Sequence, residues 1–99
     1  MIKIEVTNNH ISILGHANYD DYGKDIVCAA VSTTVITSVE AIAKFDIDAI
    51  TVIEQNDKLE LIQKKHDDIT NKLISNMLSL LQELEKKYPK NIKITNKEE

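Results

Sequence analysis

The 99-residue sequence contains no arginine and a single cysteine. All 12 basic residues are lysines, so no guanidinium is available to hold phosphates or base edges, and this disfavours nucleic-acid binding. One cysteine excludes an internal disulfide framework and is typical of a reducing cytosol. The first 15 residues lack the features of a signal peptide, and no apolar run approaches the ~20 residues that span a bilayer. We therefore expect a cytoplasmic protein without a membrane partner.

The composition is that of an ordinary globular protein, with 42% hydrophobic and 28% charged residues. A chain of this length has room for one modest core, so residues 1–99 are expected to form a single domain with a flexible tail over 95–99. The net charge of −4 mainly favours solubility.

Apolar and polar residues alternate in two pairs of short segments, which predicts two β-hairpins. The first hairpin runs from about Ile2 to Gly15, and the second consists of "AITVIEQ", the turn "ND" and "KLELIQK". A stripe of apolar residues at helical spacing follows from Ile69 to Leu84. Pro89 is expected to end that helix, and "NIKIT" supplies a last short strand.

The segment from Asp25 to Phe45 contains neither glycine nor proline. Its middle, "VSTTVITSV", would suit a strand by propensity, but about twenty residues is long for a strand and four alanines favour a helix. We predict a central helix that is apolar on most of its circumference, with Asp25 as its N-cap. The order β-β-α-β-β-α-β then predicts a single-domain α+β sandwich in which a sheet packs against two helices. Because one sheet covers only part of such a helix, and Ala29 and Ala30 permit close approach, we also expect a homodimer.

His16 and Cys28 are the candidate chemical groups. His16 follows the second predicted strand, and Cys28 lies in the first turn of the predicted helix if Asp25 caps it. Unpaired N–H groups and the helix dipole favour a thiolate there, and the same N–H groups can bind an oxyanion. An imidazole near the thiol can accept its proton and later donate it to a leaving amine. This combination is sufficient for cysteine-protease chemistry.

The residues alone leave other interpretations open. In the apolar context "DIVCAAV", Cys28 is also typical of a small buried hydrophobic residue. His16, Cys28 and an aspartate could ligate a metal, but no second cysteine supports a structural zinc site, so no metal or cofactor is expected. A single-cysteine redox protein and a non-catalytic module that binds a ribosomal protein are further alternatives. The absence of a resolving cysteine argues against the redox protein.

Two motifs carry a resemblance to a known family. "GHA" at the end of a strand and "DIVCAAVS" at the start of a helix resemble the ribosomal-processing cysteine protease family Prp, and the likeness in length and element order covers essentially the whole chain. The resemblance implies a cytosolic bacterial homodimer. It also implies an endopeptidase that removes the N-terminal leader of large-subunit ribosomal protein twenty-seven.

The same resemblance implies roles for individual residues. Cys28 matches the nucleophile and His16 the general base, while Asp25 and Ser32 match supporting polar positions, Asp25 as orienter, helix cap or both. A loop that orders over the peptide as a lid would lie between His16 and Cys28. Gly15 and Gly23 match the family glycines that flank this loop and are its expected hinges. Ala17, Tyr19 and Tyr22 are the expected substrate-binding residues, although the residues alone leave the two tyrosines open as simple loop anchors. Asn18 stands where the family loop often has a further glycine, which makes this loop bulkier.

Overall fold

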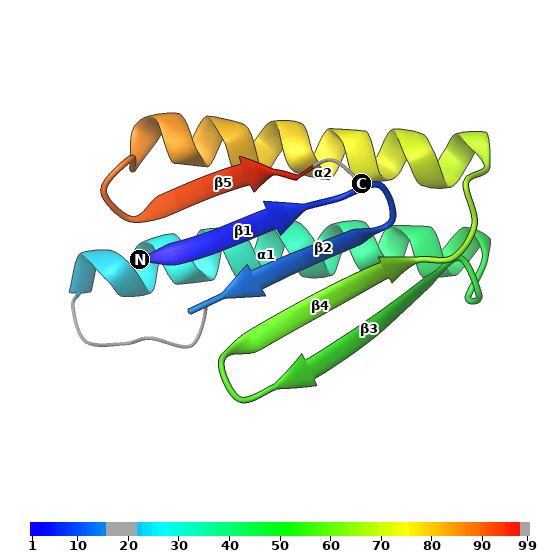
Figure 1. The fold of residues 1–99 in the computed structure, drawn as a ribbon, viewed down its shortest axis with the longest axis horizontal. Coiled ribbons are helices and arrows are strands. Elements are labelled where there is room, and N and C mark those ends of the chain that lie inside the picture. Colours follow the sequence, from blue (N-terminus) through cyan, green and yellow to red (C-terminus); the bar gives the residue numbers. More distant parts are fainter. Residues whose placement is uncertain (16–21, 98–99) are drawn as a thin grey trace.

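The computed structural model describes residues 1–15 and 22–97, with the side chains of residues 22–25 left out. Five strands and two helices follow each other in the expected order (Figure 1). Their bounds are β1 Ile2–Val6, β2 His10–Leu14, α1 Tyr22–Phe45, β3 Ile50–Gln55, β4 Lys58–Gln63, α2 Asp68–Lys87 and β5 Ile92–Asn96. The predicted α+β sandwich is confirmed.

The strands form one sheet with the order β3-β4-β2-β1-β5. Strands β1 and β2 form one antiparallel hairpin and β3 and β4 form the other, as expected from the sequence. The two hairpins join through an antiparallel β2–β4 pair, and β5 adds to the outer side of β1 as a parallel strand. Both helices lie on one face of this sheet (Figure 1). Strand β3 is therefore one edge of the sheet and β5 is the other.

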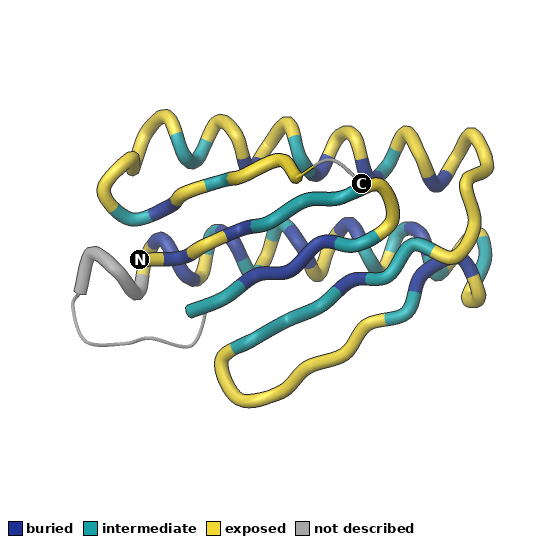
Figure 2. Tube along the Cα trace, viewed as in Figure 1, coloured by how far each residue is buried: buried dark blue, intermediate teal, exposed yellow. Residues whose placement is uncertain are grey.

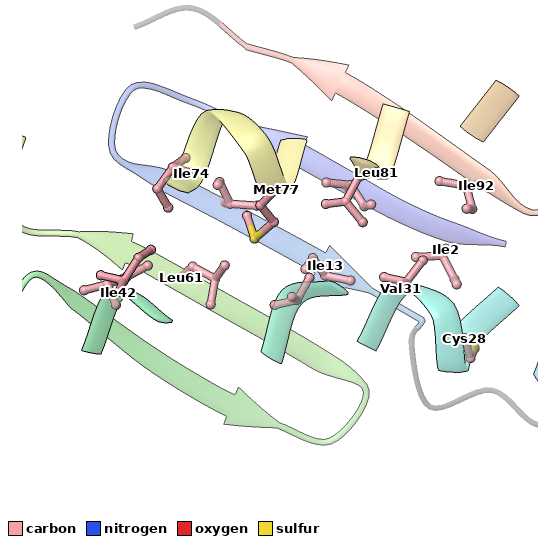
Figure 3. Packing of buried hydrophobic residues seen from close by; sticks show 14 of the residues in the cluster. Ile2, Ile13, Cys28, Val31, Ile42, Leu61, Ile74, Met77, Leu81 and Ile92 are labelled. Carbon is pink, nitrogen blue, oxygen red and sulfur yellow. The ribbon is translucent and has the colours of Figure 1, made fainter. Parts of the chain in front are cut away.

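The core lies between the sheet and the helix layer (Figure 3). Alternate strand residues and one stripe of each helix meet there, because a period of two on the strands and of 3.6 on the helices points these side chains at one another. The most deeply buried members include Ile4, Ile13, Val31, Val35, Ile42, Leu61, Met77, Leu81 and Ile92.

Helix α1 begins at Tyr22, three residues before the predicted N-cap. The expectation that Asp25 caps the helix is therefore wrong, because its backbone already lies inside the first turn. Tyr22 and Gly23, which were expected in the loop, are helical as well. A residue of the capping type marks only one possible start of a helix. Including Gly23 in α1 costs about 1 kcal/mol, which the packing of a long helix outweighs.

The β-branched middle of α1 is helical because one stripe of it packs against the sheet. Val31 and Val35 are almost completely buried there. Two of its hydroxyl groups bond back into the helix: Thr34 Oγ1 donates to the Ala30 carbonyl and Ser38 Oγ to the Thr34 carbonyl, each at 2.8 Å. Tertiary burial and these local bonds override the strand propensity of "VSTTVITSV".

The opposite face of α1 is not enclosed, contrary to the expectation of a central helix. Ile26 and Ile36 are 51% and 53% exposed. By length and composition alone, the stretch Ile26–Phe45 is also apolar enough to cross a bilayer, with a mean hydropathy of 1.8, contrary to the expectation that no apolar run approaches that length. In this fold its inner stripe packs into the core against the sheet, which accounts for part of that apolar character.

Helix α2 has a well-formed start and a clear end. Asp67 is its N-cap, and the Asp67 carboxylate accepts a hydrogen bond of 2.8 Å from the Thr70 N–H, which lowers the pKa of Asp67. The helix ends at Lys87, just before Pro89, as predicted. Strand β5 continues to Asn96, so the first part of the expected tail at 95–99 belongs to the sheet.

Charged contacts join segments that are distant in the sequence, and two of them shift pKa values. Lys65 Nζ donates to Asp46 Oδ2 at 2.7 Å, which lowers the pKa of Asp46 and raises that of Lys65. His10 Nε2 lies 2.6 Å from Glu60 Oε1 across the β2–β4 pair, and this hydrogen bond lowers the pKa of Glu60. The first contact ties the end of α1 to the segment that leads into α2.

Candidate active site

Gly15 is held in a conformation that favours glycine. Its φ is +84°, and a Cβ atom added to it would lie 2.9 Å from the carbonyl oxygen of Met1. Its N–H donates to the carbonyl of Asp57, in the turn between β3 and β4, at 2.9 Å. The end of β2 is therefore fixed between the start of β1 and the β3–β4 turn.

Cys28 lies on α1 directly beside this fixed point. Its Sγ is 4.0 Å from the carbonyl oxygen of Gly15, and the residue is only 4% exposed. Figure 3 shows the side chain at the end of the core nearest the start of α1. Because His16 follows Gly15 in the chain, the sulfur lies next to the residue that precedes the candidate base.

The thiol does not lie at the helix terminus. Cys28 is the seventh residue of α1, whereas only the first four N–H groups of a helix lack an intrahelical partner. The prediction that Cys28 occupies the first turn is wrong, because the helix starts earlier than its capping signal indicates. The favourable effect of the helix dipole fades within about one turn, so it is weaker at Cys28 than at a helix N-terminus.

The structure describes only some of the other predicted site residues. Ser32, one turn after Cys28, is half-buried on the side of α1 that faces β3. Asp25 and Gly23 lie in α1 by their backbone. His16, Ala17 and Tyr19 lie outside the described residues, as does most of the loop that was expected to act as a lid.

The described residues form two grooves that border α1, and neither was predicted from the sequence. The α1–β3 groove has a volume of about 480 Å³. It is lined by Ser32, Val35, Ile36, Val39, Glu40, Val52, Glu54, Leu59 and Leu61. The α1–α2 groove has a volume of about 490 Å³. It is lined by Ala29, Ala30, Thr33, Thr34, Leu80, Glu83, Leu84 and Lys87. The apolar character of α1 on most of its circumference was the sequence signal for these grooves. Which strands and helix form the opposite walls depends on strand pairing between segments far apart in the chain.

Within residues 1–15 and 22–97, no group of three histidine, cysteine, aspartate or glutamate side chains is arranged to hold a metal ion. What the described residues bring together is a buried thiol, the strand end that leads into His16, and a groove that starts one turn further along the helix. Burial of Cys28 by itself is equally typical of a core residue.

A family model described as cysteine protease Prp matches residues 1–93 of the chain. The chain is 34% identical over 93 residues to a protein of Mycoplasma pneumoniae named ribosomal processing cysteine protease Prp, and the match covers 90% of this chain and 88% of that protein. It is 27% identical over 107 residues to the protein of the same name from Staphylococcus aureus, covering 98% and 100% of the two chains.

Solved structures agree with these matches. The crystal structure of an essential ribosomal processing protease Prp from S. aureus in complex with a substrate peptide superimposes with a TM-score of 0.89 at 25% identity, over 98% of this chain and 100% of that one. A second crystal structure of the S. aureus protease carries a covalently linked product peptide, and it superimposes with a TM-score of 0.86 at 26% identity, with the same coverage.

Proposed function

Because the chain belongs to the cysteine protease Prp family, and is therefore a cysteine protease, we propose that Cys28 is its nucleophile and His16 its general base. The observation that supports this assignment is the 4.0 Å between Cys28 Sγ and the carbonyl oxygen of Gly15, which directly precedes His16 in the chain. Cys28 is also the single cysteine, so no other thiol competes for the role.

The proposed reaction proceeds in two halves. His16 accepts the thiol proton of Cys28, and the thiolate attacks the scissile carbonyl carbon. As the C–N bond breaks, the imidazolium returns the proton to the leaving amine, and the acyl group remains on sulfur as a thioester. Water, deprotonated by the imidazole, then attacks the thioester; the acid is released, and the thiolate regains a proton to restore the thiol.

Asp25 and Ser32 are proposed as supporting residues. Ser32 lies one helical turn from Cys28 and lines the α1–β3 groove, so we expect it to contact bound peptide rather than the scissile bond. Asp25 lies within the first turn of α1, which leaves orientation of the imidazole as its proposed role in place of capping.

The proposed substrate is the precursor of large-subunit ribosomal protein twenty-seven, from which the enzyme removes the N-terminal leader in the cytoplasm. Two relatives named for ribosomal processing support this substrate. A leader is a flexible chain end, and a flexible segment can bind in extended form against a strand edge.

The test is incubation of the source organism's own precursor with wild-type enzyme, Cys28→Ser and His16→Ala, followed by intact mass measurement and sequencing of the new N-terminus. We expect one cut at the leader boundary with wild type and none with either variant. Cleavage by Cys28→Ser would refute the nucleophile. Capture of intact precursor without cleavage by the wild type would indicate a non-catalytic binding module instead.

We further propose that two copies associate through the outer face of the helix layer. The α1–α2 groove opens there, and small residues such as Ala29 and Thr33 on one side let a second helix approach closely. Leu80 on the other side is 43% exposed although it is a large apolar residue. A second copy related by a two-fold axis would bury both surfaces.

Light scattering after size exclusion tests this interface. We expect a dimer for wild type, a monomer for Leu80→Glu and a dimer for Ile47→Glu, which changes an exposed apolar residue in the turn after α1. A monomeric wild type at micromolar concentration would contradict the proposal, and so would a Leu80→Glu variant that remains dimeric.

A further inference from the structure

The α1–β3 groove has an apolar floor and partly exposed walls. Val35 and Leu61 at its floor are almost completely buried, whereas Ile36 on α1 and Val52 on β3 are 53% and 43% exposed. Most of β3 and its following turn is exposed (Figure 2). The groove therefore offers apolar surface to a second chain.

The groove begins beside the candidate nucleophile. Ser32 lies one helical turn after Cys28, and the β3–β4 turn is hydrogen-bonded to Gly15, whose carbonyl lies beside the thiol. Its far end on α1 is Glu40, twelve residues after Cys28 in the sequence. With a rise of ~1.5 Å per helical residue this is ~18 Å, the length of about five residues of an extended peptide.

Strand β3 presents an open edge along this groove. The Asp57 carbonyl just before β4 and the Gln63 N–H at its end bond to Gly15 and Asn9, which flank β2. The backbone groups of the β4 residues between them therefore point alternately toward β2 and toward β3. With the observed register, the backbone groups of Val52 and Glu54 point away from β4, while their side chains line the groove. A peptide that adds to this edge would place every second side chain in the groove.

The opposite edge of the sheet is guarded. Glu85 of α2 accepts a hydrogen bond from the Ile94 N–H of β5 through Oε2 at 3.0 Å. This carboxylate covers a backbone donor on the outer side of β5, a common way to prevent a further strand from pairing. Strand β3 has hydrophobic residues and no lysine or proline between Ile50 and Gln55, so the edge next to the groove is the one suited to strand addition.

The groove carries negative charge on both walls. Glu40 lines it from α1 and Glu54 from β3, and within the described part of the chain neither carboxylate takes part in an ion pair. No lysine is among the lining residues. A peptide with apolar side chains over the floor and a lysine or arginine near these carboxylates would match both the shape and the charge.

We propose that the α1–β3 groove binds an extended segment of the substrate as an added strand on β3, and that Glu40 and Glu54 select a basic side chain within about five residues of the scissile bond. This role depends on the proposed protease function, since the groove is assigned to the same peptide that reaches Cys28. The carboxylates act on binding, so their loss is expected to raise KM and leave kcat nearly unchanged.

The experiment uses peptides that span the leader boundary, in which each position is replaced in turn by lysine or by glutamate. Cleavage is measured for wild type, Glu40→Gln and Glu54→Gln. The matched control is Gln82→Lys, which raises the net charge by the same one unit at an exposed position of α2 that lines neither groove. Glu40→Lys completes the set as a charge reversal.

We expect wild type to prefer lysine over glutamate at a position within this distance, with a KM about two- to fivefold lower, as for a partly exposed ion pair. Glu40→Gln or Glu54→Gln should remove the preference, Glu40→Lys should reverse it, and Gln82→Lys should keep it. The groove assignment is wrong, while the protease function stands, if wild type cleaves the peptides without preferring lysine over glutamate at any position. The same conclusion follows if Glu40→Lys keeps the wild-type preference.

Two other outcomes would overturn the proposal differently. If wild type cleaves none of the peptides and leaves the full precursor intact, the proposed function fails and the groove assignment fails with it. If Ile36→Ser converts a dimer into a monomer, a second copy of the chain covers the groove instead of a peptide.

Discussion

Replacing Gly15 by alanine tests how the strand end beside Cys28 is held. The residue has a φ of +84°, and a left-handed conformation costs an L-residue about 1–2 kcal/mol. The new Cβ would also lie 2.9 Å from the Met1 carbonyl oxygen, so the start of β1 must move, at a cost of about 1–2 kcal/mol for a tight contact with backbone. Together we expect the free energy of unfolding to fall by about 2–4 kcal/mol, a large share of the ~5–15 kcal/mol typical of a domain.

The assay is urea unfolding followed by circular dichroism, with the other glycine of the chain as the control. Gly23 lies in α1, so Gly23→Ala should leave stability unchanged or raise it by up to about 1 kcal/mol. Because the Gly15 carbonyl lies beside Cys28, Gly15→Ala should also lower kcat under conditions where it remains folded. A Gly15→Ala protein within about 0.5 kcal/mol of wild type would refute the reasoning.

Two further predictions concern stability. Three carboxyl groups, Asp46, Glu60 and Asp67, have pKa values held below their ordinary range by hydrogen bonds in the folded state. Their contribution to stability is fully present above the unfolded pKa values near ~4 and is lost as the pH falls through the lower folded values. Urea midpoints should therefore drop below about pH 4, and a midpoint that stays constant from pH 6 to about pH 3 would contradict this. Leu81→Ala should destabilise the protein by about 2–5 kcal/mol because its side chain is completely buried. Ile69→Ala, at a position of α2 that is 44% exposed and lines neither groove, should cost under about 1 kcal/mol, and equal losses in urea unfolding would show that the helix is oriented differently.

The element order and both hairpins were predictable because local patterns determine them. The alternation around Ile4 and Ile13 gave the first hairpin, and the apolar stripe that includes Ile74, Met77 and Leu81 gave α2. The resemblance of "GHA" and "DIVCAAVS" to the protease family was confirmed by the family match over residues 1–93.

The start of α1 and the two grooves were not predictable from local patterns. Asp25 is a good capping residue by type, yet the helix continues three residues further toward the N-terminus. The left-handed Gly15 depends on the approach of Met1, and the α1–β3 groove depends on which hairpin edge lies outermost. Such features arise from contacts between segments far apart in the chain, which composition and periodicity do not encode.

The most direct test of the central claim is to trap the acyl-enzyme on Cys28. Enzyme and precursor peptide are mixed, quenched in acid within the first turnover, and analysed by intact mass and peptide mapping. We predict a mass increase equal to the acyl fragment, located on the peptide that contains Cys28, removed by hydroxylamine and absent in Cys28→Ser. Turnover that proceeds without any adduct on Cys28, or that persists in Cys28→Ser, would contradict the account.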